Sequence, residues 1–194
     1  HSLLSLPTRG EFKDLEGEHL NRLQQSLGGM EYLITDEMSM MGRKMFGQVD
    51  RRLRQVFPHR SDQVLGGCSC LLVGDFGQLP SVMDLPLYTT VPSSAISDIG
   101  SSVYQSFHHA VVLDQIMRQS GNDPDQVRFR ELLLRLRNGE VTEDDWKLLM
   151  TRTPAHITDS TSFDNSLHLF PTVEAVVDYN INKLHACGQP VATI

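Results

Sequence analysis

Four short apolar runs, separated by stretches with helical periodicity, constrain the fold of this 194-residue chain most strongly. They are residues 32–35, 70–73, 110–113 and 167–170. Each run is continuous rather than alternating, which is typical of strands that are covered on both faces. Strands that alternate with helices predict an α/β fold with a mainly parallel sheet.

Helices are expected where apolar residues recur at three- and four-residue steps. One helix should run from about Glu18 to the Gly28-Gly29 pair, and another should end at Asn138-Gly139. Thr142, with Asp145 three residues later, predicts the start of a helix that contains Trp146, which we expect in the core. The Pro-, Ser- and Thr-rich stretch 79–99 is expected to be a loop. The periodic positions are Met45, Val49, Leu53 and Val56; Phe129, Leu132, Leu133 and Leu136; and Val173, Val176, Val177, Ile181 and Leu184.

Composition excludes several classes of protein. With 40% hydrophobic and 21% charged residues, the chain can bury a core, and no apolar run is long enough to cross a bilayer. The formal charge of −7 excludes a generally basic nucleic-acid-binding surface, although a local basic groove stays possible. Three cysteines suit a reducing compartment, and Cys68-Ser69-Cys70 is either half of a metal site or two small thiols entering a strand. The chain starts without Met or a signal pattern, so we expect it to be a piece of a longer protein.

The strongest chemical signal is an apolar strand that runs directly into Asp36 and Glu37. In open α/β sheets, ligands bind at the carboxyl ends of strands. Asp36 is suited to hold Mg²⁺ through water, since this cation prefers oxygen ligands and keeps part of its hydration shell. Glu37 is suited to orient and deprotonate the water that attacks a γ-phosphate. A solvated strand end before a turn explains the same pattern.

Two further strand ends carry polar residues of the same kind. Gly74 to Pro80 follows the second run, and there Gln78 can donate and accept hydrogen bonds, as a γ-phosphate sensor must. Arg118 follows the third run and could pair with phosphate oxygens. A polar turn residue and a surface arginine are the alternative interpretations.

Taken together, these segments resemble the superfamily-one DNA helicases, and most closely the petite-integration-frequency (Pif) family of 5′-to-3′ helicases, which is related to RecD. Residues 36–40 (DEMSM), 74–80 (GDFGQLP) and 117–119 (MRQ) resemble its second, third and arginine-glutamine motifs, and His1-Ser2 resembles the end of an element that touches single-stranded DNA. Residues 129–142 fit its inter-domain helices, and residues 169–184 fit the start of its second motor domain.

The resemblance implies a P-loop NTPase fold of the RecA-like class: a partial first motor domain (residues 1–119), an inter-domain helical segment (120–165) and the start of a second motor domain (166–194). It implies an intracellular ATP-dependent helicase, in the nucleus or mitochondrion if eukaryotic, that acts on single-stranded DNA and duplex junctions in repair, recombination or telomere maintenance. ATP and Mg²⁺ are the implied cofactors, and no membrane partner is implied. The implied catalytic residues are Asp36, Glu37, Gln78 and Arg118, Asp75 joins them in nucleotide binding, and His1, Ser2, Phe76 and Pro80 are the implied DNA contacts.

Departures from that family matter for activity. No Gly-x-x-x-x-Gly-Lys-Ser/Thr run occurs in the 194 residues, so we expect no appreciable ATPase from this chain alone. Ser81 and Gly77 replace a second proline and a bulky residue, which predicts a looser loop beside Gln78. A non-catalytic module that binds DNA or a partner, the helicase part of a transposon protein and another kind of P-loop NTPase are the alternative functions.

The predicted helix from Gly42 to His59 carries five basic residues: Arg43, Lys44, Arg51, Arg52 and Arg54. A track for the phosphate backbone of DNA and a solvated, charged helix face both explain them, and we favour the solvated face.

Overall fold

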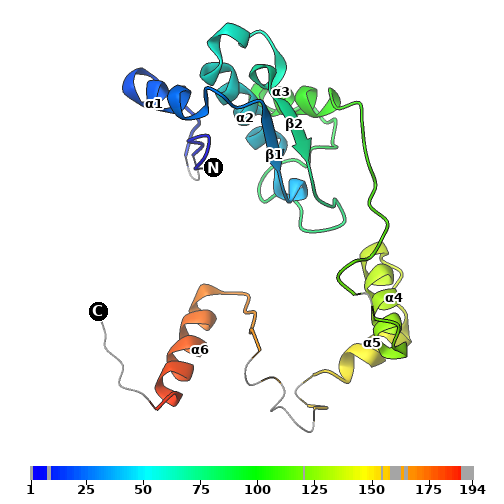
Figure 1. Cartoon of the computed structure of the whole chain (residues 1–194). Helices are drawn as coiled ribbons and strands as arrows, with labels where there is room; N and C mark the ends of the chain where they lie inside the picture. Colours follow the sequence, from blue (N-terminus) through cyan, green and yellow to red (C-terminus); the bar gives the residue numbers. More distant parts are fainter. Residues whose placement is uncertain are drawn as a thin grey trace. The chain divides into compact units, whose positions relative to one another are not determined.

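The structure is a computed structural model that describes residues 2–7, 10–119, 121–153, 155–157, 163 and 166–188. It divides into two compact units, His1–Glu140 and Val141–Ile194. Figure 1 labels the helices and strands. The first contains α1 (Gly17–Leu27), β1 (Tyr32–Thr35), η1 (Met38–Met40), α2 (Arg43–Val56), η2 (Pro58–Arg60), η3 (Val64–Gly67), β2 (Ser69–Leu72), α3 (Ala95–Gln105) and α4 (Pro124–Asn138). The second contains α5 (Glu143–Met150) and α6 (Val173–Ala186). The division into residues 1–119, 120–165 and 166–194 stays a prediction.

The first two expected strands form a parallel pair, which confirms a small parallel sheet in a mixed α/β chain. The register aligns Tyr32 with Ser69 and Thr35 with Leu72. Leu33 is buried, whereas Tyr32 is 63% and Ile34 is 67% exposed, so only one face of β1 is covered. The expectation that both faces are covered was therefore wrong for this strand. A continuous apolar sequence makes burial of both faces of a strand favourable, but burial also needs another element that packs on each face.

Two other expected strands are absent. Residues 110–113 and 167–170 adopt no regular structure, and Val111, Leu167 and Leu169 are each at least 87% exposed. A strand needs a neighbour that satisfies its backbone groups, and no described strand pairs with either segment. Hydrophobicity alone was the wrong guide here.

The core of the first unit is built around α2. Phe46 and Leu53 on this helix are completely buried. The helix packs against α3, and the two cross so closely that a Cβ at Gly47 would lie 1.9 Å from the Ile96 carbonyl oxygen. A Cβ at Gly100 would lie 1.9 Å from the Arg43 carbonyl oxygen. Glycine at both positions therefore permits the backbones to touch.

Helix α3 corrects the expectation of a loop through Ile99. Its sequence, AISDIGSSVYQ, is rich in serine, which has modest helix propensity. Packing on α2 supplies the stability that local sequence lacks, because most helical stability in proteins comes from tertiary contacts.

The helix ends follow the expected signals. Helix α1 spans the expected residues, and Gly139 ends α4 in the left-handed conformation with φ 74°. Thr142 and Asp145 form a reciprocal capping box at the start of α5. Trp146 is 59% exposed, so placing it in the core was wrong. The buried residue of α5 is Asp145, since the capping box draws its carboxylate inward. No helix in the described ranges is long and apolar enough to cross a membrane.

Candidate active site

The ends of β1 and β2 lie together at one edge of the sheet. Beyond the strands, the Val73 amide donates to the Thr35 carbonyl at 2.8 Å, and the Met38 amide donates to the Val73 carbonyl at 3.0 Å. These two bonds join the segment after β1, which holds Asp36 and Glu37, to the segment after β2. The backbone therefore joins the segments that follow the two strands at one edge of the sheet.

Gly74 permits this close approach. Its φ is 150°, and a Cβ there would lie 2.7 Å from the Met38 amide nitrogen. Backbone atoms cannot yield as the end of a flexible side chain can, so any larger residue would push the two segments apart. Gly74 therefore holds the acidic segment and the Gln78 segment in backbone contact.

Both acidic side chains at the end of β1 are exposed. Glu37 has φ 53° and ψ 48°, a left-handed conformation that is strained for a residue with a Cβ. The Asp36 carboxylate accepts a hydrogen bond from the Glu37 amide at 2.8 Å and so stabilises this turn. The one-turn helix η1 follows at once, with Ser39 buried. Solvent-facing carboxylates on a strained, well-anchored turn are free to take a hydrated cation and a water molecule.

Asp75 is fully engaged with other groups of the chain. Its carboxylate pairs with the Arg137 guanidinium at 2.7 and 3.0 Å and accepts the Gly77 amide at 2.8 Å. Arg137, the Gly77 amide and Gln78 lower the pKa of Asp75 to about 2. Gln78 itself is exposed, and its amide donates to the Asp75 carbonyl at 3.0 Å. The exposed side chain of Gln78 therefore lies on an ordered turn close to Asp75.

The residues expected to touch DNA fall in different settings. The Phe76 ring is partly buried and makes edge contacts with the rings of Tyr88 (5.1 Å) and Tyr104 (6.1 Å). Packing against these two rings explains the aromatic side chain at position 76 without a stacked DNA base. Pro80 and Ser2 are exposed, and His1 lies outside the described residues.

Arg118 is not brought to the strand ends. It is exposed in a segment without regular structure, and among the described residues no hydrogen bond or ion pair joins it to Asp36, Glu37 or Gln78. Its expected placement rested on residues 110–113 forming a third strand, which they do not. Its role therefore stays a prediction that needs movement of this segment.

The basic residues of α2 divide into two groups. Lys44 and Arg51 are exposed, as expected for a solvated helix face, whereas two others are not. Arg43 and Arg52 are only 1% exposed, so neither lies on a solvated face or on a track for DNA. Arg52 donates to the Lys13 carbonyl at 3.0 Å and lies over the Phe12 ring, and burial lowers its pKa. Arg51 pairs with Asp14 on the surface.

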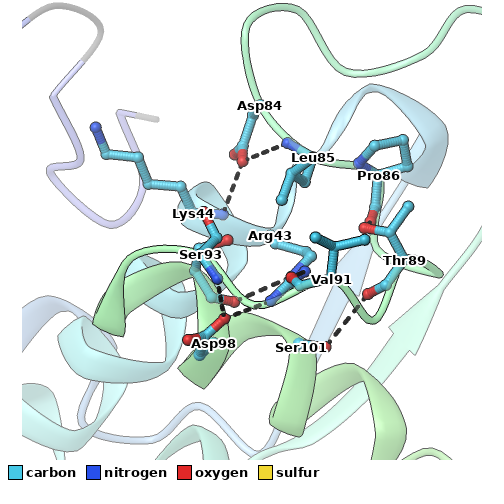
Figure 2. A network of polar contacts seen from close by, with 11 residues as sticks. Arg43, Lys44, Asp84, Leu85, Pro86, Thr89, Val91, Ser93, Asp98 and Ser101 are labelled. Carbon is cyan, nitrogen blue, oxygen red and sulfur yellow. Dashed lines mark hydrogen bonds and ion pairs between the residues drawn. The ribbon is translucent and has the colours of Figure 1, made fainter.

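Arg43 and Asp84 hold the loop that follows Gln78, and sequence reasoning missed this role (Figure 2). Arg43 donates to the Val91 carbonyl at 2.6 Å and pairs with Asp98 at 2.6 Å. Asp84 accepts the amides of Lys44 (3.1 Å) and Met45 (3.2 Å), so a distant residue caps α2. Gly42 at the helix start offers no side chain for this task, which is the one signal that could have indicated an outside acceptor.

The cysteines offer little to a metal ion. Burial raises the pKa of Cys68, and it raises that of Cys70 to about 11, so both are thiols rather than thiolates at neutral pH. Within the described ranges, no three His, Cys, Asp or Glu side chains gather as a metal site. A site for Mg²⁺ needs only one or two carboxylates when phosphates and water complete its shell, and Asp36 with Glu37 fits that donor set.

Comparisons with known proteins agree with this geometry. Two curated relatives are the ATP-dependent DNA helicase RRM3 of Saccharomyces cerevisiae, 28% identical over 112 residues, and the ATP-dependent DNA helicase PIF5 of Trypanosoma brucei brucei, 25% identical over 155 residues. These alignments cover 58% and 70% of this chain but only 14% and 16% of the relatives, so the chain spans a small part of their length.

Solved structures match over nearly the whole chain. The Pif1 helicase from Bacteroides in complex with ADP-AlF3 and ssDNA is 27% identical, with a TM-score of 0.65 over 99% of this chain and 44% of that chain. The Pif1 helicase from Candida albicans shares the fold at 22% identity, with a TM-score of 0.70 over 90% of this chain and 36% of that chain. The family described as PIF1-like helicase matches residues 1–147. This chain therefore belongs to the PIF1-like helicase family.

Proposed function

We propose that this chain is part of an ATP-dependent DNA helicase and supplies the residues that position Mg²⁺ and activate the attacking water. The observation that carries the proposal is the backbone contact between the two polar strand ends, through the Met38 amide and the Val73 carbonyl. It joins the segment that carries Asp36 and Glu37 to the segment that leads to Gln78, at the kind of sheet edge where α/β proteins bind ligands, and this supports the proposal.

Asp36 and Glu37 divide the work at this edge. Asp36 would hold Mg²⁺ through water, and the bound cation would neutralise charge on the transferred phosphoryl group. Glu37 would orient the attacking water and take its proton. Both carboxylates are exposed, as a site open to nucleotide from solution requires.

Gln78 and Arg118 would respond to the γ-phosphate. The turn that presents Gln78 is ordered by Asp75, and the loop beyond it is held by Arg43 and Asp84. Arg118 would reach the phosphate only after the segment around residues 110–119 closes on the sheet. Nucleotide-dependent closure of this kind would drive movement along single-stranded DNA and separation of the duplex.

The decisive experiment uses the protein encoded by the longest reading frame that contains these 194 residues. Glu37→Gln should lower DNA-stimulated ATP hydrolysis by about 10²–10⁴-fold, the usual contribution of a general base, while ATP binding persists. Glu16→Gln, at an exposed carboxylate that makes no capping bond before α1, is the matched control with the same change of side chain. Unchanged turnover in the Glu37 variant would remove Glu37 from catalysis.

A non-catalytic DNA- or partner-binding module is the second candidate, favoured by the absence of a Gly-x-x-x-x-Gly-Lys-Ser/Thr run in these residues. The same experiment separates the two. If the protein of the longest reading frame binds single-stranded DNA but hydrolyses no ATP, the binding module is supported and the helicase function is refuted.

A further inference from the structure

The Asp75–Arg137 ion pair joins the turn of Gln78 to the last turn of α4, across 62 residues of sequence. The Arg137 Nε and Nη2 donate to separate carboxylate oxygens, at 3.0 and 2.7 Å, which is the bidentate geometry that fixes orientation as well as distance. Gly77 leaves room for the guanidinium, since a Cβ there would lie 3.1 Å from the Arg137 Nε.

Among the described residues, this ion pair is the main contact between α4 and the segments that follow the strands. Helix α4 makes no extensive contact with α1, α2, α3 or either strand in the described part of the chain. The pair is half-exposed, with side-chain exposures of 28% for Asp75 and 50% for Arg137. Exposed pairs add little to stability, so this one is suited to open and close rather than to hold the fold.

Arg137 lies close in sequence to the point where the first compact unit ends and the second begins. Helix α4 ends at Asn138, Gly139 turns the chain in the left-handed conformation, and the second compact unit begins at Val141. The side chain of Arg137 therefore lies two residues before the turn that leads into that unit.

We propose that Asp75 and Arg137 are positioning residues that couple the γ-phosphate-sensing turn of Gln78 to the end of α4, and so make DNA affinity depend on the bound nucleotide. The inference rests on the proposed motor function. It assigns Asp75 to this coupling, because its carboxylate is occupied by Arg137 and the Gly77 amide. With a pKa of about 2, Asp75 stays ionised near neutral pH, so the pair responds to geometry and not to protonation.

The test measures coupling directly in the protein from the longest reading frame. The Kd for a single-stranded oligonucleotide is compared with and without ADP and aluminium fluoride. We expect the wild-type Kd to change by about 5–150-fold, the usual size of coupling between two sites. In Arg137→Gln and in Asp75→Asn, which keeps an acceptor for the Gly77 amide, the change should fall below about twofold. The nucleotide Kd measured without DNA should be unaltered in Arg137→Gln.

Two further variants separate coupling from simple damage. Arg137→Lys keeps the positive charge without the bidentate fork and should retain more of the coupling than Arg137→Gln. Arg128→Gln, on the same helix without a partner in the described contacts, should leave coupling at the wild-type value. In the 194-residue chain, Arg137→Gln should also speed amide exchange at Gly77 and Gln78, whose amides bond to Asp75.

Wild-type coupling in Arg137→Gln, or unchanged amide exchange at Gly77 and Gln78, would overturn the inference. That failure would leave ATP hydrolysis and its loss in Glu37→Gln intact. Failure of the proposed function is a different result, namely a wild-type protein that hydrolyses no ATP.

Discussion

Replacing Arg43 by Met tests whether a buried charge on α2 anchors the loop after Gln78. The Arg43 side chain is 1% exposed, and its guanidinium bonds to the Val91 carbonyl (2.6 Å), the Ser97 carbonyl (3.3 Å) and the Asp98 carboxylate (2.6 Å). Methionine fills much of the same volume, so little cavity results. The change instead removes the donor from three acceptors at once.

The exposure of those acceptors sets how much the free energy of unfolding should fall. Removing one partner of a buried ion pair costs about 3–5 kcal/mol. The Asp98 side chain is 47% exposed and can regain water, which places Arg43→Met near the low end, at about 3 kcal/mol. With a urea dependence of ~2 kcal/mol per M for a domain of this size, the unfolding midpoint should fall by about 1.5 M.

Urea unfolding followed by far-UV circular dichroism measures this shift, and hydrogen exchange locates it, since α2 and α3 amides should lose protection. Arg51→Met is the matched control on the same helix. Its pair with Asp14 is exposed, 53% and 38%, and should be worth no more than about 1 kcal/mol. Equal midpoint shifts for the two variants would refute the idea that burial makes Arg43 important.

Three shorter predictions follow from other contacts. Gly100→Ala places a Cβ 1.9 Å from the Arg43 carbonyl oxygen and should destabilise the chain by at least about 1 kcal/mol in thermal unfolding, whereas Gly29→Ala, with open space around it, should not. Glu37→Gly should relieve the strain of the left-handed backbone and raise the free energy of unfolding by about 1 kcal/mol in thermal unfolding. The same change should remove ATPase activity from the protein of the longest reading frame. A lower free energy of unfolding would argue against strain at this position. Arg137 lowers the pKa of Asp75, so the ion pair stabilises the fold above about pH 4, and this stabilisation is lost as pH falls toward 2. Acid unfolding of Asp75→Asn should lack this pH-dependent loss, and an acid transition identical to that of the wild type would contradict the prediction.

The parts of the fold that could be predicted are those encoded locally. Thr142 with Asp145, and Gly139 after α4, act through bonds and φ angles within one turn, so their residue types alone indicate helix ends. The β1 and β2 strands were predictable together with the polar residues that follow them. The segments that carry them leave the sheet at one edge because parallel strands share the direction of their carboxyl ends.

The remaining features depend on partners that lie far away in sequence. Residues 110–113 are as apolar as β1, yet an apolar run does not specify which strand it pairs with. Arg43 looks like a surface residue until Asp98 and the Val91 carbonyl, about fifty positions later, are folded against it. The serine-rich α3 is helical because α2 covers it, which no local propensity indicates.

The central claim is that Asp36, Glu37 and Gln78 face one nucleotide, and a crystal structure of the longest protein with ADP, aluminium fluoride and Mg²⁺ tests it most directly. We predict Asp36 within one water molecule of the cation, and Glu37 and Gln78 beside the fluoride that stands for the γ-phosphate. A nucleotide bound elsewhere, with these three side chains still facing solvent, would contradict the account.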